Sequence, residues 1–345
     1  MLIQREKSPR AKTGLGRTIT IRDGQSTICL DPQTIRTGTL NFISHAHADH
    51  LPSRVELGSS AYASQVTAAV ALHRTNKTIT FRDIDQETPR IIAYDAGHTI
   101  GSTQFLINTS TASVLYTGDF CPRKRFFLSG AQPIDCDLLI IESTYGEPVH
   151  QFPHPKVILR YAKDWIEDCF ARSQVPVLVG YSFGKAQLLC AFLEKISVKY
   201  VVHPAIAQIN GVLGRFGYDF KGQILTDPSS RKLVLSEDIA IVSPRRLPQR
   251  YQNPKSRYYY GYFTGQSFFS KASGTHFLLS DHADFDDLIR HINGCNPDKV
   301  LCFLYPGSKK ARILAQHVER ITGIEAISLD DPISPQKKLR DYLVS

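Results

Sequence analysis

The sequence contains no uninterrupted apolar run long enough to cross a bilayer, which predicts a protein without a membrane-spanning segment. Its basic N-terminus, MLIQREKSPRAKTGLGR, lacks the apolar stretch and the small-residue cleavage site of a secretory signal peptide. The seven cysteines form no Cys-x-x-Cys pair and their number is odd, which disfavours both a disulfide framework and a cysteine zinc site. We therefore expect reduced, buried cysteines in a cytoplasmic protein.

Charge is the first positive feature, because 41 Lys and Arg residues against 32 Asp and Glu residues give a formal net charge of +9 at pH 7. This balance favours binding to polyanions, since each Lys or Arg that neutralises a phosphate releases condensed counterions. The 42% hydrophobic and 21% charged fractions are ordinary for a globular protein. At 345 residues the chain is long enough for two domains, or for one large domain with an insertion.

The first 146 residues are expected to form strands whose ends carry polar residues. Residues 18–31, TITIRDGQSTICLD, predict two strands joined by an Asp-Gly turn. Further strands are expected at 40–44, 91–98, 112–120 and 135–146, with a helix over 59–74. Strand ends on a rigid scaffold present side chains without burying them in the core, so a functional site is expected there.

From residue 147 the pattern changes to alternating helices and strands, which predicts a small parallel sheet. Helices are expected at 156–172, 183–196 and 205–217, and strands at 175–182, 199–203 and 239–243. A strand at 276–280 then leads into the polar stretch SDHAD. We predict an α/β protein in which residues 147–270 form a domain inserted between two parts of a core, 1–146 and 271–345.

The densest chemical signal is SHAHADH, Ser44 to His50, in which three histidines and an aspartate follow an apolar strand. In an extended loop alternate residues point the same way, so His45 and His47 can chelate one metal ion. Asp49 and His50, beyond the turn, can reach a second ion. A solvated polar loop is the alternative, but the density of imidazoles favours metal binding.

Two later segments supply further candidate ligands for these two metal ions. His98 lies between glycines in AGHTIGS, and Asp119 follows an apolar strand in YTGDF. A carboxylate can bridge two cations. Two ions about 3.5–4 Å apart can activate a water and stabilise both oxygens of a phosphoryl displacement. His282, directly after an apolar strand in SDHAD, is the candidate that completes the second ion's shell; the alternative is a helix-start cluster with Ser280 or Asp281 as the N-cap.

These segments resemble the motifs of a known family. HAHADH, GHTIGS, TGDF, ESTYG and SDHAD, in this order, are similar to those of the metallo-β-lactamase superfamily, specifically its β-CASP nucleic-acid-processing branch, and the resemblance spans residues 18–308. It implies an αβ/βα sandwich with the site at the edges between the sheets, capped by an inserted β-CASP-like α/β domain. It also implies that Glu142 of ESTYG orients a histidine of the site, although the residues alone equally allow a surface pairing.

One departure from the family pattern bears on the substrate. Members that cut RNA internally usually carry a further histidine near the C-terminus, followed by glycine, whereas FLYPGS here has Pro306 at that position. The short cap and the spelling SDHADF are more similar to the compact DNA exonucleases of the cross-link-repair and ligase-associated groups. ESTYG is more similar to the RNA-processing members. On balance DNA is favoured over RNA.

Five residues are candidates for holding the substrate. Arg123 and Lys124 lie in CPRKRF, just past the TGDF motif, where they could line the path of a strand; a solvated basic turn explains them equally well. Ser182 and Lys185 begin a helix directly after a strand, where backbone N–H groups can bind an anion. Ser308 in PGSKK opens another helix in the same way. Either helix start could bind a terminal phosphate, which would suit an exonuclease.

These residues predict a metal-dependent hydrolase that acts as an exonuclease on single-stranded DNA or RNA. Imidazole and carboxylate ligands predict two divalent ions, zinc foremost, with manganese tolerated. Asp49 is expected to orient the attacking water or to receive its proton, and Glu142 to act in catalysis through the histidine it orients. The alternatives are an endonuclease of the mRNA 3′-end-processing type, a small-molecule hydrolase of the superfamily, and a relative that only binds nucleic acid. No dimerisation module is visible, so a monomer is expected.

Overall fold

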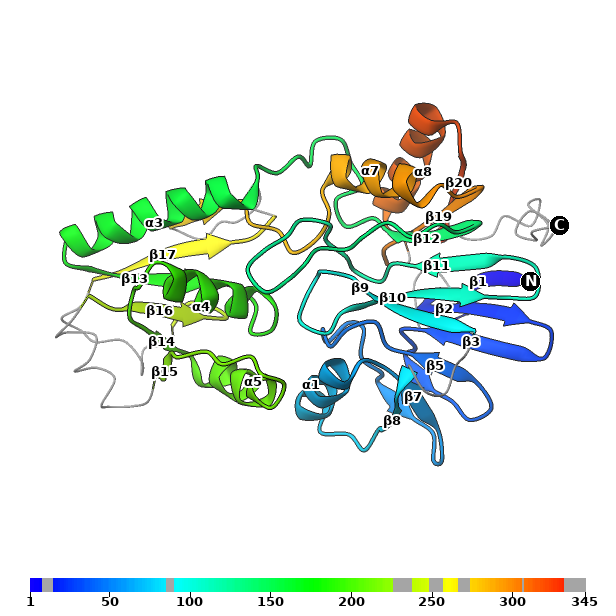
Figure 1. Ribbon diagram of the computed structural model, residues 1–345, viewed down its shortest axis with the longest axis horizontal. Helices are drawn as coiled ribbons and strands as arrows, with labels where there is room; N and C mark the ends of the chain where they lie inside the picture. The colour runs from blue at the N-terminus through cyan, green and yellow to red at the C-terminus, as the bar shows by residue number, and fades with distance from the viewer. Residues whose placement is uncertain are drawn as a thin grey trace. The chain divides into compact units, whose positions relative to one another are not determined.

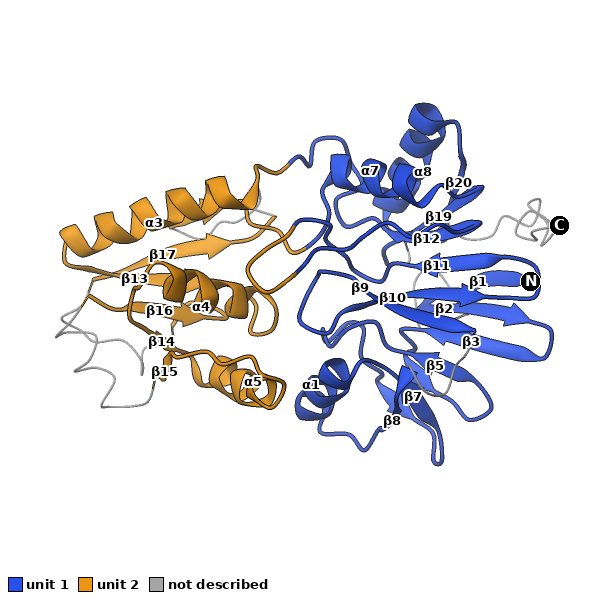
Figure 2. Cartoon of the chain, in the orientation of Figure 1, with its two compact units in different colours: residues 1–123, 129–151, 282–345 blue, residues 124–128, 152–281 orange. Residues whose placement is uncertain are grey.

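A computed structural model describes residues 1–7, 15–84, 90–225, 238–247, 257–265, 274–305 and 307–331. The chain folds into two compact units (Figures 1 and 2). The first comprises Met1–Arg123, Ser129–Gln151 and His282–Ser345, and the second comprises Lys124–Leu128 and Phe152–Asp281. Along the sequence, the second unit is therefore inserted into the first.

The first unit contains two six-stranded sheets. In the first sheet the strands follow the order β1 (Leu2–Lys7), β2 (Leu15–Asp23), β3 (Ser26–Leu30), β5 (Leu40–Phe42), β7 (Ser60–Tyr62) and β8 (Thr80–Arg82). β2 and β3 form the predicted hairpin, in which Asp23 pairs with Ser26 and Gly24 has a φ of 57°. A tight hairpin turn needs such a left-handed residue, which explains the Asp-Gly pair. Two short strands, β4 (Thr34–Ile35) and β6 (Arg54–Val55), pair separately.

The second sheet of this unit packs against the first. Its strand order is β20 (Glu325–Ser328), β19 (Lys299–Phe303), β12 (Leu138–Glu142), β11 (Ser113–Tyr116), β10 (Thr103–Asn108) and β9 (Ile91–Asp95). Side chains alternate across a strand. Ile140 therefore packs with Phe42 of the first sheet, whereas Ile141 packs with Leu288 of α7 (Phe285–Cys295) and Leu314 of α8 (Lys309–Thr322). The two helices cover the face of the second sheet that is turned away from the first (Figure 1).

The helix expected over 59–74 is shorter than predicted. α1 spans Gln65–Thr75, and the residues before it form β7, which pairs with β5 and β8. Ser64 is the N-cap, and its side chain accepts a hydrogen bond from the Thr67 N–H. A short apolar stretch such as SSAYAS suits a buried strand as well as a helix, so the capping serine marks the start better than the apolar pattern does.

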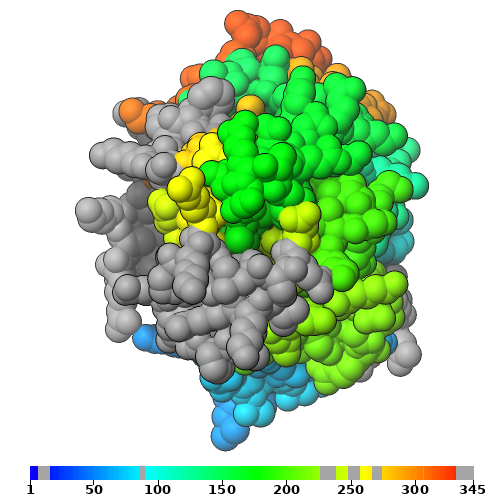
Figure 3. Space-filling model, turned by 90° about the vertical axis from the view of Figure 1, so that its left-hand side faces the viewer, coloured from blue at the N-terminus to red at the C-terminus, as the bar shows by residue number. Residues whose placement is uncertain are grey.

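The second unit contains one parallel sheet, as the alternation of helices and strands predicted. Its order is β15 (Gln223–Ile224), β14 (Tyr200–Val202), β16 (Ala240–Ser243), β13 (Gln174–Val179), β17 (Arg257–Phe263) and β18 (Thr275–Phe277), and every pairing is parallel. The helices of this unit are α3 (Pro155–Ala171), α4 (Lys185–Lys195) and α5 (Pro204–Gly214). α3 and β17 meet through the rings of Trp165 and Tyr259, whose centroids are 5.9 Å apart; Figure 3 views this end of the unit, with α3 in green and β17 in yellow.

The cysteines confirm the prediction made for them, since all seven are buried and unbridged. Burial raises the pKa of Cys136 and that of Cys169 to about 12, which keeps both as thiols at neutral pH. No helix in the described ranges is both long and apolar enough to cross a membrane.

Candidate metal centre

The SHAHADH loop starts where β5 ends and is anchored by backbone hydrogen bonds. The carbonyl of Ser44 accepts from the N–H of Thr103 in β10 at 2.9 Å, and the N–H of His50 donates to the carbonyl of His47 at 3.0 Å. The first bond ties the loop to the second sheet of the unit, and the second closes a turn. His45 is fully buried as a result.

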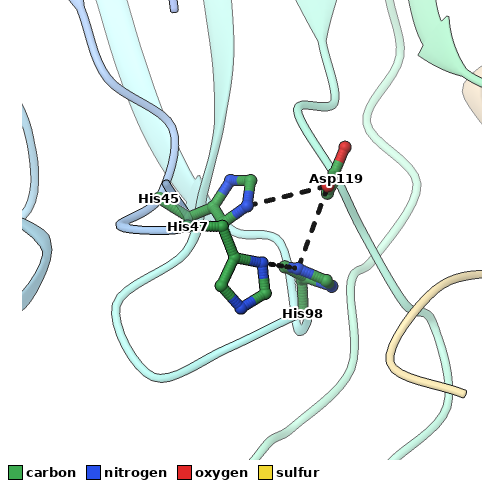
Figure 4. Close-up of side chains that lie close together, drawn as sticks. All are labelled: His45, His47, His98 and Asp119. Atoms are coloured by element: carbon green, nitrogen blue, oxygen red, sulfur yellow. Dashed lines mark hydrogen bonds and ion pairs between the residues drawn. The ribbon is translucent and has the colours of Figure 1, made fainter. Parts of the chain in front are cut away.

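Four side chains from three loops converge beside this turn, as Figure 4 shows: His45, His47, His98 and Asp119. The Nε2 atom of His98 lies 3.0 Å from the Nδ1 atom of His47. The Oδ2 atom of Asp119 lies 3.6 Å from the Nε2 atom of His45 and 3.9 Å from that of His98. One possible ligand atom from each residue lies within 4.8 Å of the others, a spacing at which a single cation could be bound.

Two glycines allow the later loops to approach the first. Gly97 has a φ of 63°, and a Cβ atom there would lie 2.4 Å from a backbone carbonyl oxygen. Gly118 has a φ of 54°, and a Cβ atom there would lie 2.7 Å from the Cβ atom of Ser44. Because L side chains disfavour this backbone region and neither position has room for one, glycine is required immediately before His98 and before Asp119.

His50 extends the cluster on a second side of Asp119. Its Nε2 atom lies 3.3 Å from the Oδ2 atom of Asp119 and 4.0 Å from the Oδ2 atom of Asp49. The Asp49 side chain is 72% exposed, and its backbone carbonyl accepts a hydrogen bond from Arg17. His50 and Asp49 thus lie beside the carboxylate that Asp119 contributes to the first group.

The sequence prediction missed Asp31, which lies behind these histidines. Its Oδ2 atom accepts hydrogen bonds at 2.7 Å from Ser44 Oγ and from the Tyr116 hydroxyl, and lies 2.7 Å from His50 Nδ1. The Ser44 hydroxyl is also 3.0 Å from His45 Nδ1. Asp31 therefore orients His50 directly and His45 through Ser44. Asp31 directly follows the apolar strand β3, and this signal could have identified it.

Glu142 and His282 form a second pair of this kind. The Nδ1 atom of His282 lies 2.9 Å from Oε1 and 3.1 Å from Oε2 of Glu142. Glu142 also accepts a hydrogen bond from the Phe120 N–H at 2.9 Å and is almost fully buried. The ring centroids of His98 and His282 are 4.5 Å apart, and Asp119, Glu142 and His282 form the second close group of possible ligands. The histidine that Glu142 orients is therefore His282.

Burial and neighbouring charges set the protonation states of the centre. Burial, with the adjacent charge of His50, lowers the pKa of His45 well below its usual value, so that His45 is a neutral ligand. Burial opposes protonation of His50, yet the carboxylates of Asp119 and Asp31 raise its pKa well above the usual value. Burial also opposes ionisation of Asp119, but the charge of His50 holds its pKa well below the usual range. Metal binding would displace the proton of His50.

Comparison with known proteins adds relatives of two kinds. A probable DNA ligase from Opitutus terrae is 30% identical over 277 residues, 76% of this chain and 26% of the ligase. Cleavage and polyadenylation specificity factor subunit 3 of Dictyostelium discoideum is 29% identical over 127 residues, 36% of this chain and 16% of that protein. Endoribonuclease YSH1 of Mycosarcoma maydis is 32% identical over 122 residues, 35% of this chain and 13% of that protein. The chain therefore spans about a quarter or less of each relative's length.

These relatives support the resemblance of the chain to the β-CASP branch of the metallo-β-lactamase superfamily. No protein-family model matches the chain. The crystal structure of a protein of unknown function from Enterococcus faecalis V583 shares its fold, with a TM-score of 0.59 at 14% identity, over 83% of this chain and 90% of that one.

The residues of the centre fit a bound metal ion. The Nε2 atom of His45 is buried and has no hydrogen-bond partner in the described part of the chain, a costly state for a polar atom unless a ligand occupies it. Neutral imidazoles and an ionised carboxylate are the donors that zinc prefers. Each of His45, His50 and His282 also has its other ring nitrogen beside a hydroxyl or carboxylate, as metal-binding histidines usually do.

The predicted metal residues all belong to the first unit, whereas several predicted substrate residues belong to the second. Lys124, Ser182 and Lys185 belong to the second unit, where the Nζ atom of Lys185 is buried and donates to the Leu279 carbonyl and to Asp281. Lys124 is exposed.

In the first unit, Arg123 pairs with Asp284 and Asp287. The Ser308 side chain caps α8 by accepting from the Lys310 N–H. Pro306 lies outside the described residues. The phosphate-binding roles of these side chains stay predictions.

Proposed function

We propose that the protein is a two-metal nuclease that hydrolyses phosphodiester bonds, removing nucleotides from the end of single-stranded DNA or RNA. The observation that carries this proposal is the position of Asp119 Oδ2, which lies 3.3–3.9 Å from ring nitrogens of His50, His45 and His98. A carboxylate in this position can bridge two metal ions, and two adjacent ions can carry out an in-line phosphodiester displacement.

The residues divide between two ions. His45, His47 and His98 would hold one, and Asp49, His50 and His282 would hold the other, with Asp119 shared. Ligand chemistry favours zinc and tolerates manganese. When bound, such ions supply a hydroxide at neutral pH and neutralise charge that builds up on the phosphate oxygens.

The chain's own side chains would orient the reactants and move the proton. Asp49 has an exposed carboxylate beside His50, so it can accept the proton of the attacking water. Glu142 fixes the ring of His282 through Nδ1, which leaves Nε2 to face the reaction. Asp31 holds His50 in the same way, so that neither ring needs to reorient when substrate arrives.

The architecture supports the finer fold assignment. Two facing sheets with α7 and α8 outside them are consistent with an αβ/βα sandwich. The parallel sheet of the second unit is consistent with a β-CASP-like cap, for which we propose residues 147–270. Lys124, Ser182, Lys185 and Ser308 stay candidates for contacts with the substrate's phosphates.

DNA is the substrate that we favour. A match to a probable DNA ligase covers 76% of this chain, whereas the matches to the polyadenylation factor and the endoribonuclease cover about a third. A second candidate, an RNA endonuclease of the mRNA 3′-end-processing type, is supported by those same shorter matches and by the ESTYG motif.

The test is degradation of matched single-stranded DNA and RNA, end-labelled and carrying either a 5′-phosphate or a 5′-hydroxyl, by zinc-loaded and manganese-loaded protein. Asp119→Asn is the inactive control. Stepwise shortening of DNA from one end is expected. Internal cuts in RNA would support the second candidate instead, and no cleavage of any substrate under either metal would refute a nuclease.

A further inference from the structure

Arg123 is held in the first unit by two buried carboxylates that follow His282 in the sequence. Its Nη2 atom contacts Oδ2 of Asp284, and its Nε atom lies 2.5 Å from Oδ2 of Asp287. The side chains of Asp284 and Asp287 are 2% and 5% exposed, and that of Arg123 is 18% exposed. Arg123 therefore has its charge neutralised within the protein.

The requirements of the adjacent helix do not explain this arginine. Asp284 is the N-cap of α7, and its Oδ1 atom accepts from the Asp287 N–H at 2.9 Å. This capping box already satisfies the helix start. Arg123 neutralises two carboxylates that are buried at this helix start. It also joins the helix to a second segment.

That segment leads directly from Asp119. Phe120, the next residue, accepts a backbone hydrogen bond from the Ala283 N–H at 2.9 Å, and its own N–H donates to Glu142 Oε1 at 2.9 Å. The same Glu142 oxygen lies 2.9 Å from His282 Nδ1. The residues after Asp119 and those after His282 are thus joined at three points, by the Phe120–Ala283 hydrogen bond, by Glu142 and by Arg123.

The residue on the other side of His282 is held in a similar way within the second unit. Oδ1 of Asp281 lies 3.1 Å from Nη1 of Arg125 and 2.6 Å from Nζ of Lys185. All three side chains are nearly fully buried. The residues before and after His282 in the sequence therefore each pair with an arginine of one short stretch, CPRKRF.

We propose that Arg123 is a positioning residue that sets His282 relative to Asp119, through its contacts with Asp284 and Asp287. This inference rests on the proposed nuclease function of the same centre. It differs from the phosphate contact that the sequence suggests for Arg123, and the two roles have different kinetic consequences. A positioning residue changes kcat, whereas a phosphate contact that is equal in the ground and transition states changes KM.

The experiment compares Arg123→Gln, Arg123→Lys and Arg290→Gln with the wild type on the end-labelled substrate. Arg290 is the matched control, because its 65% exposed side chain contacts the other carboxylate oxygen of Asp287, at 2.5 Å, from the solvent side. We expect Arg123→Gln to lower kcat about 10–100-fold with KM nearly unchanged, by analogy with residues that orient metal ligands. Arg123→Lys should recover part of the loss, and Arg290→Gln should resemble the wild type.

A second readout does not depend on turnover. The Nδ1 proton of His282 donates to Glu142, and its resonance in 15N-histidine-labelled protein can be assigned by its absence from His282→Gln. We expect this resonance to shift in Arg123→Gln and to stay in place in Arg290→Gln. If Arg123→Gln does not fold, a smaller shift and a smaller loss of kcat in Arg123→Lys are expected.

The outcomes separate the two proposals. A wild type that cleaves nothing would refute the nuclease function, and the His282 resonance alone would then decide the role of Arg123. A raised KM with unchanged kcat in Arg123→Gln would overturn positioning in favour of a phosphate contact. Identical behaviour of Arg123→Gln and Arg290→Gln in both readouts would overturn it altogether.

Discussion

The Nδ1 atom of His50 lies 2.7 Å from the Oδ2 atom of Asp31, a residue outside the predicted set of metal ligands. This hydrogen bond fixes the orientation of the ring and leaves Nε2 toward Asp119. A carboxylate behind a metal-binding histidine also makes that histidine a stronger donor. The affinity of the second metal ion should therefore depend on Asp31.

Asp31→Asn is expected to lower the affinity for the second zinc ion about 10–100-fold, because an amide is a weaker hydrogen-bond acceptor than a carboxylate for His50 and Ser44. The measurement is competition with a chelator of known zinc affinity. Tyr116→Phe is the matched control, because it removes another 2.7 Å hydrogen bond to the same oxygen and leaves His50 in place. Equal losses in both variants would show that packing around Asp31, and not its contact with His50, supports the metal.

The buried pair between Arg5 and Asp330 should stabilise the first unit. Nη2 of Arg5 lies 2.6 Å from Oδ1 of Asp330, with side chains 3% and 0% exposed. Arg5→Leu should lower the free energy of unfolding by about 3–5 kcal/mol, since it leaves a buried carboxylate without its cation. Arg312→Leu, which breaks an exposed pair with Asp331, should have little effect. The two metal-free variants are compared by urea unfolding. Similar midpoint urea concentrations for both would contradict the predicted stabilisation by the buried pair.

Sequence reasoning identified what depends on local pattern. The Asp-Gly hairpin, the parallel sheet and the loops that carry the histidines all have signals within a few residues. Asp31 was missed because its role depends on partners brought together by folding: Tyr116 lies 85 positions away along the chain. The pairing of Arg123 with Asp284, 161 positions later, also has no local signal, since a basic turn has the same sequence whether it binds a phosphate, is solvated or pairs with a carboxylate.

Gly97 should be intolerant of any side chain. Its φ of 63° and the 2.4 Å approach of a Cβ atom to a backbone oxygen would force the His98 loop to move in Gly97→Ala. Overpacking of this kind costs about 1–3 kcal/mol, in addition to the unfavourable φ. Gly58→Ala isolates the effect of φ, because Gly58 has a φ of 76° and a Cβ atom there would meet nothing within 4 Å in the described part of the chain. In thermal unfolding, the midpoint temperature of Gly97→Ala should be clearly lower than that of Gly58→Ala. The reverse order would mean that the His98 loop adapts to the added side chain.

The role of His282 can be decided by counting metal ions. As a ligand of the second ion, His282 should be required for its retention, so His282→Gln should hold about one zinc ion where the wild type holds two. Glu142→Gln should lower the affinity for that ion less, because the amide oxygen can still accept a hydrogen bond from Nδ1 of His282. Metal content is measured by mass spectrometry after dialysis against graded chelator, with turnover measured on the same samples. If the His282→Gln variant loses turnover but keeps its full metal content, His282 is not a metal ligand. The ring that Glu142 orients would then serve to donate a proton to the leaving oxygen.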